Sequence, residues 1–189
     1  MASVNSSFLE VSIGPNNEKK QKTAYLVLFW TKIALLVLSV SCFINAFFVN
    51  NLFWFPLALF VFFLVIVWHF QHKYYNFYDY AFVMGSVRTN VVINNKKSKP
   101  FANFDCDKII KAGNINSDFY VKNCQTNEFK VYKATPNELT EYDTVFLVQG
   151  LKEVRIIILQ FNEKFLSKIL SSSSLQKYDR EYLKLITNK

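Results

Sequence analysis

The sequence is poor in the residues from which metal and catalytic sites are usually built. Its 189 residues include three cysteines, two histidines and four glycines. The cysteines, Cys42, Cys106 and Cys124, are too widely spaced for the closely paired ligands of a structural zinc site. The glycines form no phosphate-binding loop, and no serine-centred nucleophile elbow occurs. These absences argue against the commonest nucleotide-binding, hydrolytic and zinc-dependent functions.

The two histidines do not make up for these absences. His69 and His72 are three residues apart, so on a continuing helix they would share one face. Only Asp79 stands near enough in the sequence to be a third ligand, and metal sites usually need three or four. We therefore expect no metal, no cofactor and no catalytic residue, and predict that the chain is not an enzyme.

Charge is absent from one long part of the sequence. Between residues 24 and 70, Lys32 is the only Asp, Glu, Lys or Arg. Two apolar runs, Ile33–Val49 and Leu52–Phe70, are separated by a pair of asparagines. About 20 apolar residues in a helix cross a hydrocarbon core of roughly 30 Å, and a backbone in lipid must satisfy its own hydrogen bonds. Residues 24–72 are predicted to be a transmembrane helical hairpin.

The charges around this hairpin indicate its orientation. Lys19, Lys20 and Lys22 precede the hairpin, and Lys73 follows it. The turn between the two apolar runs has no charged residue. By the positive-inside rule, both termini are expected to be cytoplasmic, in a multi-pass protein of the plasma membrane. Lys32 lies near the cytoplasmic end, where it can extend its ammonium group to the headgroups. Cys106 and Cys124 would then lie in a reducing cytosol, so we expect free thiols.

A cleaved signal peptide is the rival interpretation of the first apolar run. Such a peptide needs a short apolar region ending in a small-residue cleavage site, which is missing here. The run Leu38–Cys42 loosely resembles a lipoprotein signal, but Ser39 stands where that motif has a branched apolar residue. Cys42 is expected instead to pack between the two helices.

The sequence after the hairpin changes to the short, β-branched and aromatic runs typical of strands. We expect strands at 78–84, 87–93 and 99–104, a short helix or continuing strand at 105–113, short strands at 118–121 and 128–132, a loop at 135–141, and a β-hairpin formed by 144–148 and 154–159. A helix follows over 161–170, with Asn162 as its N-cap. We expect a cytosolic segment at 1–23, an antiparallel β domain at 73–170 and a helical tail at 171–189, with its helix at 175–186.

A family resemblance follows from these residues. An opening strand with Tyr78, Tyr80, Phe82 and Gly85, a basic turn, and a closing strand that leads into a helix over 159–170 are all present. This arrangement resembles uncharacterised two-span membrane proteins of low-GC Gram-positive bacteria that carry a PH-like cytosolic domain. The resemblance implies an α+β fold in which a bent antiparallel sheet or barrel is capped by a C-terminal helix. PH-like folds host unrelated roles, so no function comes with it.

The densest basic patch is the candidate lipid-binding site. It comprises Arg88, Lys96, Lys97 and Lys99, with Lys73 beside the membrane. A basic residue near anionic lipid contributes about 1 kcal/mol. An ordinary solvated hairpin turn would have the same composition, so both interpretations stay open.

The run Asp105–Cys106–Asp107 resembles a reactive thiol site at first sight. Two carboxylates beside a thiol raise its pKa and make it less reactive. We expect a buried Cys106 between two exposed aspartates.

Taken together, the sequence predicts a membrane-anchored, non-enzymatic protein whose domain binds a protein partner or anionic lipid headgroups at the inner leaflet. One alternative is a small accessory subunit of a larger membrane complex, with Phe60, Phe62 and Phe63 packed on partner helices. The partner would be another protein or, in a homo-oligomer, a second copy of this chain. A remote alternative is an unrecognised membrane-associated enzyme. Nucleic acid is disfavoured as a partner, because acidic residues are interleaved with the basic ones.

Overall fold

The computed structural model describes residues 8–71, 75–93, 97–151 and 153–187. They form two compact units, each described by itself. The hairpin unit consists mainly of residues 15–76. The β unit consists of residues 8–14, 77–92 and 97–187.

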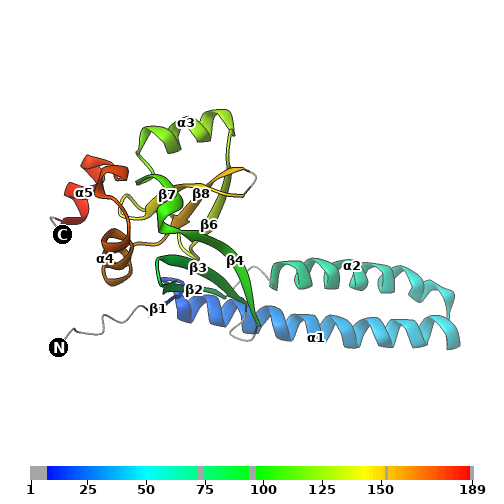
Figure 1. The fold of residues 1–189 in the computed structure, drawn as a ribbon. Coiled ribbons are helices and arrows are strands. Elements are labelled where there is room, and N and C mark those ends of the chain that lie inside the picture. Colours follow the sequence, from blue (N-terminus) through cyan, green and yellow to red (C-terminus); the bar gives the residue numbers. More distant parts are fainter. Residues whose placement is uncertain (1–7, 72–74, 94–96, 152, 188–189) are drawn as a thin grey trace. The chain divides into compact units, whose positions relative to one another are not determined.

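The hairpin unit is the helical hairpin that the apolar runs predict. Helix α1 (Glu18–Phe48) and helix α2 (Trp54–Gln71) run side by side, and the short 3-10 helix η1 (Asn51–Phe53) completes the turn between them (Figure 1). Asn50 stabilises this turn, since its side-chain oxygen accepts a hydrogen bond of 2.9 Å from the Leu52 amide. Among the described residues, two helical segments are long and apolar enough to cross a membrane, Glu18–Phe48 and Asn51–Gln71.

The apolar windows of both helices face outward. Their large apolar side chains, such as Val37 and Phe62, are mostly exposed, whereas the core helix of a soluble protein would be mostly buried. The two helices meet instead along small side chains. Ser39 and Ala46 are buried and Cys42 is half-buried, at a spacing that places all three on one face of α1. Small residues at the interface let membrane helices approach closely.

One polar contact joins the two helices. The Lys32 ammonium donates a hydrogen bond of 2.9 Å to the side-chain oxygen of Gln71, which is the last residue of α2 and is buried. The same ammonium lies 5.3 Å from the centre of the Phe29 ring. Lys32 is thus tied to α2 by an amide that the sequence analysis did not pair with it.

The first sheet of the β unit begins before the hairpin. Its strand order is β1–β2–β3–β4, formed by Phe8–Ile13, Asn76–Val83, Ser86–Ile93 and Lys97–Asp105. Strand β1 pairs antiparallel with β2, with Phe8 opposite Val83 and Ile13 opposite Tyr78. The hairpin is therefore inserted in the chain between two paired strands. The sequence analysis assigned no strand to residues 8–13.

The second sheet has the strand order β5–β7–β8–β6, formed by Ile109–Gly113, Thr144–Gln149, Val154–Leu159 and Lys130–Ala134. Strands β7 and β8 form the expected hairpin, and β5 pairs antiparallel with β7. Strand β6 departs from the antiparallel pattern, because it runs parallel to β8. The reason is the loop after β6, which passes over the end of β8 before entering β7.

Two apolar cores hold these sheets. The larger lies between the first sheet, one face of the second sheet and two C-terminal helices, α4 (Glu163–Ser172) and α5 (Arg180–Thr187). The smaller covers the opposite face of β7 and β8 and is closed by α3 (Asp118–Thr126). The central strands are thus buried on both faces, which explains their continuous apolar sequence. Asn162 caps α4 as predicted, accepting a 3.0 Å bond from the Phe165 amide.

The structure corrects one expected element and resolves another that the sequence left open. Residues 118–121 are not a strand but the start of α3, which ends at Asn127 in the left-handed conformation. Phe119 and Tyr120 reach the smaller core from this helix, so their aromatic character reflects helix packing. The region 105–113 contains both alternatives in turn, the 3-10 helix η2 (Cys106–Lys108) and then β5.

Candidate functional site

A groove at the edge of the first sheet is the candidate site in the β unit. It has a volume of about 430 Å³. One wall is the second half of β4 with Lys108 of η2, and the other wall is the end of β7, the following turn and the start of β8. The groove thus joins segments that lie at least 40 residues apart along the sequence.

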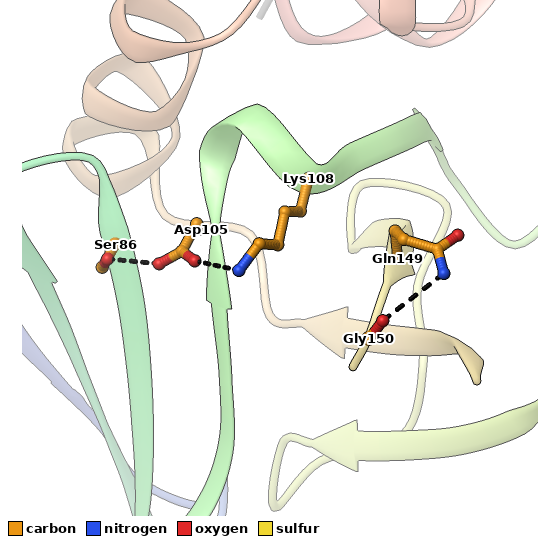
Figure 2. Close-up of polar contacts among 5 residues, drawn as sticks. All are labelled: Ser86, Asp105, Lys108, Gln149 and Gly150. Atoms are coloured by element: carbon orange, nitrogen blue, oxygen red, sulfur yellow. Dashed lines mark hydrogen bonds and ion pairs between the residues drawn. The ribbon is translucent and has the colours of Figure 1, made fainter. Parts of the chain in front are cut away.

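A polar cluster forms the first wall (Figure 2). Asp105 accepts a hydrogen bond of 2.5 Å from the Ser86 hydroxyl and one of 2.7 Å from the Lys108 ammonium. The Lys108 ammonium and the Ser86 hydroxyl together hold the pKa of the Asp105 carboxyl below its ordinary value. The same ion pair raises the pKa of Lys108. Asp105 is therefore a fixed carboxylate whose charge Lys108 largely balances.

The opposite wall is built around a tight turn. The Gly150 backbone N–H donates a 3.0 Å hydrogen bond to the Glu153 carbonyl. The Gln149 side-chain amide donates one of 3.4 Å to the Gly150 carbonyl (Figure 2). A side chain at Gly150 would meet the Arg155 guanidinium at 2.7 Å, so glycine lets Arg155 lie against the turn. Leu151, at the tip, is 95% exposed. This wall presents a cation and an uncovered apolar side chain.

Strand β4 is the edge of its sheet in the described part of the chain. The backbone N–H and C=O of Ala102 both bond to the Thr89 hydroxyl of β3. Because backbone groups alternate in direction along a strand, those of Phe101 and Asn103 point away from β3. Phe101 and Asn103 line the groove, so its wall includes an open strand edge. Such an edge can pair with an extended segment of another chain.

The run Asp105–Cys106–Asp107 does not form a reactive thiol site. Cys106 is 1% exposed, which confirms its expected burial. Burial, followed by the charges of Asp107 and Asp105, raises the pKa of the Cys106 thiol to about 11. A thiol with so high a pKa is a poor nucleophile at neutral pH. Asp107 is exposed as expected, whereas Asp105 is half-buried in the groove wall.

The structure brings three of the predicted basic residues onto neighbouring strands. Arg88 lies on β3, and Lys97 and Lys99 lie on the first half of β4; all three are exposed. Lys73 and Lys96 fall outside the described residues, as does His72. In the part of the chain that the structure describes, no three His, Cys, Asp or Glu side chains are grouped so that they could hold a metal ion.

Other buried polar residues serve the fold. The loop that crosses the end of β8 is held by Asn137, whose amide donates to the Gly14 carbonyl at 3.1 Å and to the Gln160 side chain at 2.8 Å. Asp143 accepts from the amides of Thr140 and Phe161 at 2.8 and 2.9 Å. These bonds fasten the loop, and the Gly14 end of β1, to the β unit.

Two buried tyrosines complete this network. The Tyr80 hydroxyl donates to the Ala134 carbonyl and accepts from the Gln160 amide, while the Tyr182 hydroxyl donates to the Tyr142 carbonyl at 3.0 Å. Burial raises the pKa of both phenols. Their partners are backbone groups and, for Tyr182, also the Thr144 hydroxyl, so they stabilise the fold and offer no acid or base to a ligand.

Sequence reasoning identified the basic residues but not the groove. Asp105 was singled out for the thiol beside it, and Lys108, Gly150 and Arg155 were not singled out. The available signals were the edge-strand proline Pro100 and the Gly150 turn. Neither signal indicates that β4 and the β7–β8 turn face each other.

The fold described above is that of an α+β protein in which a helical hairpin is combined with two β-sheets and closing helices. The sequence matches the bacterial PH-like domain family (DUF6106) over residues 5–178, and the chain belongs to this family. The match includes β1 and the hairpin as well as the β unit, so the inserted hairpin is part of the matched region. No curated protein and no solved structure matches the chain.

Proposed function

We propose that this chain is a non-enzymatic binding protein anchored at the inner face of the plasma membrane, with both termini in the cytoplasm. The hairpin holds the PH-like β unit at the membrane. The β unit binds an extended segment of a protein partner in the groove between β4 and the β7–β8 turn. The observation that carries this proposal is the open edge of β4 forming one wall of that groove.

The groove also indicates the chemistry of the partner segment. Its backbone would pair with the outward groups of Phe101 and Asn103, as an added strand does. An apolar side chain would cover Leu151. Arg155 lines the groove and favours an acidic side chain, because Lys108 already balances the negative charge of Asp105. We therefore propose an acidic, extended segment.

Site-specific photo-crosslinking in membranes tests this proposal. A photoreactive residue at Asn103 or at Leu151 is expected to capture the same partner. The matched control is Lys122, which is exposed on α3 and does not line the groove. The substitution Asn103→Pro removes an outward N–H of an edge strand, which such strands tolerate, and should abolish capture from Leu151. Equal capture from Lys122, or capture that survives Asn103→Pro, would contradict the proposal.

A second candidate function rests on the exposed basic residues of β3 and β4. Arg88, Lys97 and Lys99 would bind anionic headgroups, with about 1 kcal/mol from each residue near the surface. Hydrogen exchange of the full chain in vesicles tests this function. Phosphatidylglycerol is expected to protect the β4 amides more than phosphatidylcholine does. The triple variant Arg88→Gln, Lys97→Gln, Lys99→Gln should remove that difference; protection that is the same in both lipids argues against headgroup binding.

A further inference from the structure

A second groove lies in the hairpin unit, at the end opposite the turn. Helix α1 has 31 residues and α2 has 18, so the first turns of α1 extend past the end of α2 (Figure 1). The groove measures about 740 Å³. Its walls are apolar and come from both helices: Ala24, Val27 and Leu28, and Ile66, Val67 and Phe70.

The groove is polar at one end. Lys19 and Lys20 line it there, and Val27 lies seven residues after Lys20, about 10 Å further along the helix axis. Within the described residues, neither lysine has a carboxylate partner. The nearby Glu18 accepts a 3.1 Å hydrogen bond from the Tyr75 hydroxyl, and Tyr75 stacks on Tyr25. At 100° per residue, Glu18 and Tyr25 lie on a different side of α1 from Lys20 and Val27. The two ammonium groups are thus available to a ligand.

We propose that this groove binds one anionic glycerophospholipid. The phosphate would lie between the Lys19 and Lys20 ammonium groups, and an acyl chain would follow the apolar walls toward Val27 and Val67. The arrangement of the groove supports this occupant. Its two lysines match a phosphate, and the apolar walls further along the helix axis match an acyl chain. The setting supports it as well. The groove opens on the outside of a hairpin that is apolar enough to span the membrane, where lipid is the surrounding solvent.

This site is independent of the binding surfaces of the β unit. It uses none of the residues of β3, β4 or the β7–β8 turn. It predicts that lipid binding survives when Arg88, Lys97 and Lys99 are neutralised, so the lipid site and the proposed function can fail separately.

Native mass spectrometry of the full chain in detergent tests the site. Dioleoyl-phosphatidylglycerol and dioleoyl-phosphatidylcholine are titrated in parallel, so only the headgroup differs. We expect tighter binding of one phosphatidylglycerol. The variant Lys19→Gln, Lys20→Gln should lose about 30-fold in that affinity, which corresponds to about 2 kcal/mol for two lysines. Lys22→Gln is the matched control, because Lys22 lies in the same stretch of α1 but does not line the groove. This control should retain the affinity.

A second pair of variants tests the apolar part without changing charge. Val27 is 58% exposed and lines the groove, so Val27→Trp should fill the trough while the helix folds normally. Leu26→Trp adds the same side chain beside it, at a position outside the groove. Only Val27→Trp should weaken phosphatidylglycerol binding, by at least tenfold.

Three results would overturn the proposal. The first is equal affinity for the two lipids. The second is an equal loss in Lys22→Gln, which would indicate a diffuse polybasic attraction. The third is full competition by soluble glycerophosphoglycerol, which has no acyl chains and would identify a phosphate site instead of a lipid site.

Discussion

The two units of this protein expose opposite kinds of surface. In the hairpin, large apolar side chains point outward; Phe62 is 62% exposed, for example. In the β unit, Phe146 and Tyr80 are fully buried. Both units are rich in aromatic residues, so aromatic content does not separate them. Outward phenylalanines are stable in lipid and costly in water, so the proposed membrane position of the hairpin would account for the difference.

The units also treat polar groups differently. In the hairpin, the Lys32 ammonium of α1 donates a hydrogen bond to the Gln71 side chain of α2. In the β unit, buried polar side chains such as Asp143 bond mainly to backbone groups of a crossing loop. Polar contacts therefore connect elements in the hairpin and fix an irregular segment in the β unit.

The largest expected effect tests the contrast in burial. Phe146→Ala removes a ring from the main core, where it packs 5.3 Å from Phe104, and should cost about 3–5 kcal/mol of unfolding free energy. Phe62→Ala, the matched change in the hairpin, should cost less than about 0.5 kcal/mol. Denaturant unfolding followed by hydrogen exchange measures both, at β7 and β8 for Phe146→Ala and at α2 for Phe62→Ala. A large loss in Phe62→Ala would show that its ring packs within the chain or on a partner helix.

The next effect concerns a local feature of the β unit. Asn162→Ala removes the N-cap of α4 and should lower stability by about 1 kcal/mol. Asn162→Ser retains a capping oxygen and should restore most of the loss. Chemical denaturation followed by circular dichroism measures both variants. Equal stability of the alanine and serine variants would rule out a capping role.

A smaller effect is expected in the hairpin. Gln71→Leu leaves the Lys32 ammonium without its amide partner, and hydrogen bonds between membrane helices contribute about 0.6 kcal/mol on average. All three tryptophans, Trp30, Trp54 and Trp68, lie in this unit, so their fluorescence during thermal unfolding reports it selectively. Gln71→Glu restores an acceptor and serves as the control. If Gln71→Leu stabilises the hairpin, the contact is not a net attraction.

The smallest effect is a pH dependence at the groove of the β unit. Because the pKa of Asp105 is lower in the folded chain than in the unfolded one, the carboxylate contributes stability above its ordinary pKa of about 3.9. That contribution is lost as the pH falls through the folded pKa. Asp105→Asn should flatten this part of the stability profile, and Lys108→Met should weaken it. Salt should reduce the effect, since the pair is half-exposed. If the loss of stability at acidic pH is unchanged in Asp105→Asn, Asp105 is not its source and the prediction is contradicted.

The sequence predicts those parts of the fold that have local patterns. The hairpin follows from its apolar length, and the β7–β8 hairpin follows from strands buried on both faces. Strand β1 alternates Leu9, Val11 and Ile13 with polar residues, which is also a local strand pattern, although a short one. Helix α3 was mistaken for a strand because aromatic residues and Val121 favour strands in isolation.

The sites could be predicted only in part. The basic residues of β3 and β4 are visible in the sequence as charges. The groove is not, because it forms where an edge strand meets a turn from a distant part of the chain, and no local pattern encodes that meeting. The hairpin groove depends likewise on how far α1 extends past the end of α2, which the helix packing decides.

The central proposal is that the hairpin spans the membrane with the β unit on the cytoplasmic side. Cys124 is exposed on α3 and Cys106 is buried, so a variant with Cys42→Ala presents one accessible thiol. A membrane-impermeant maleimide should label Cys124 only after cells are permeabilised. Adding Asn51→Cys, in the exposed turn of the hairpin, should give labelling in intact cells. Labelling of Cys124 in intact cells, with Asn51→Cys protected, would contradict the account.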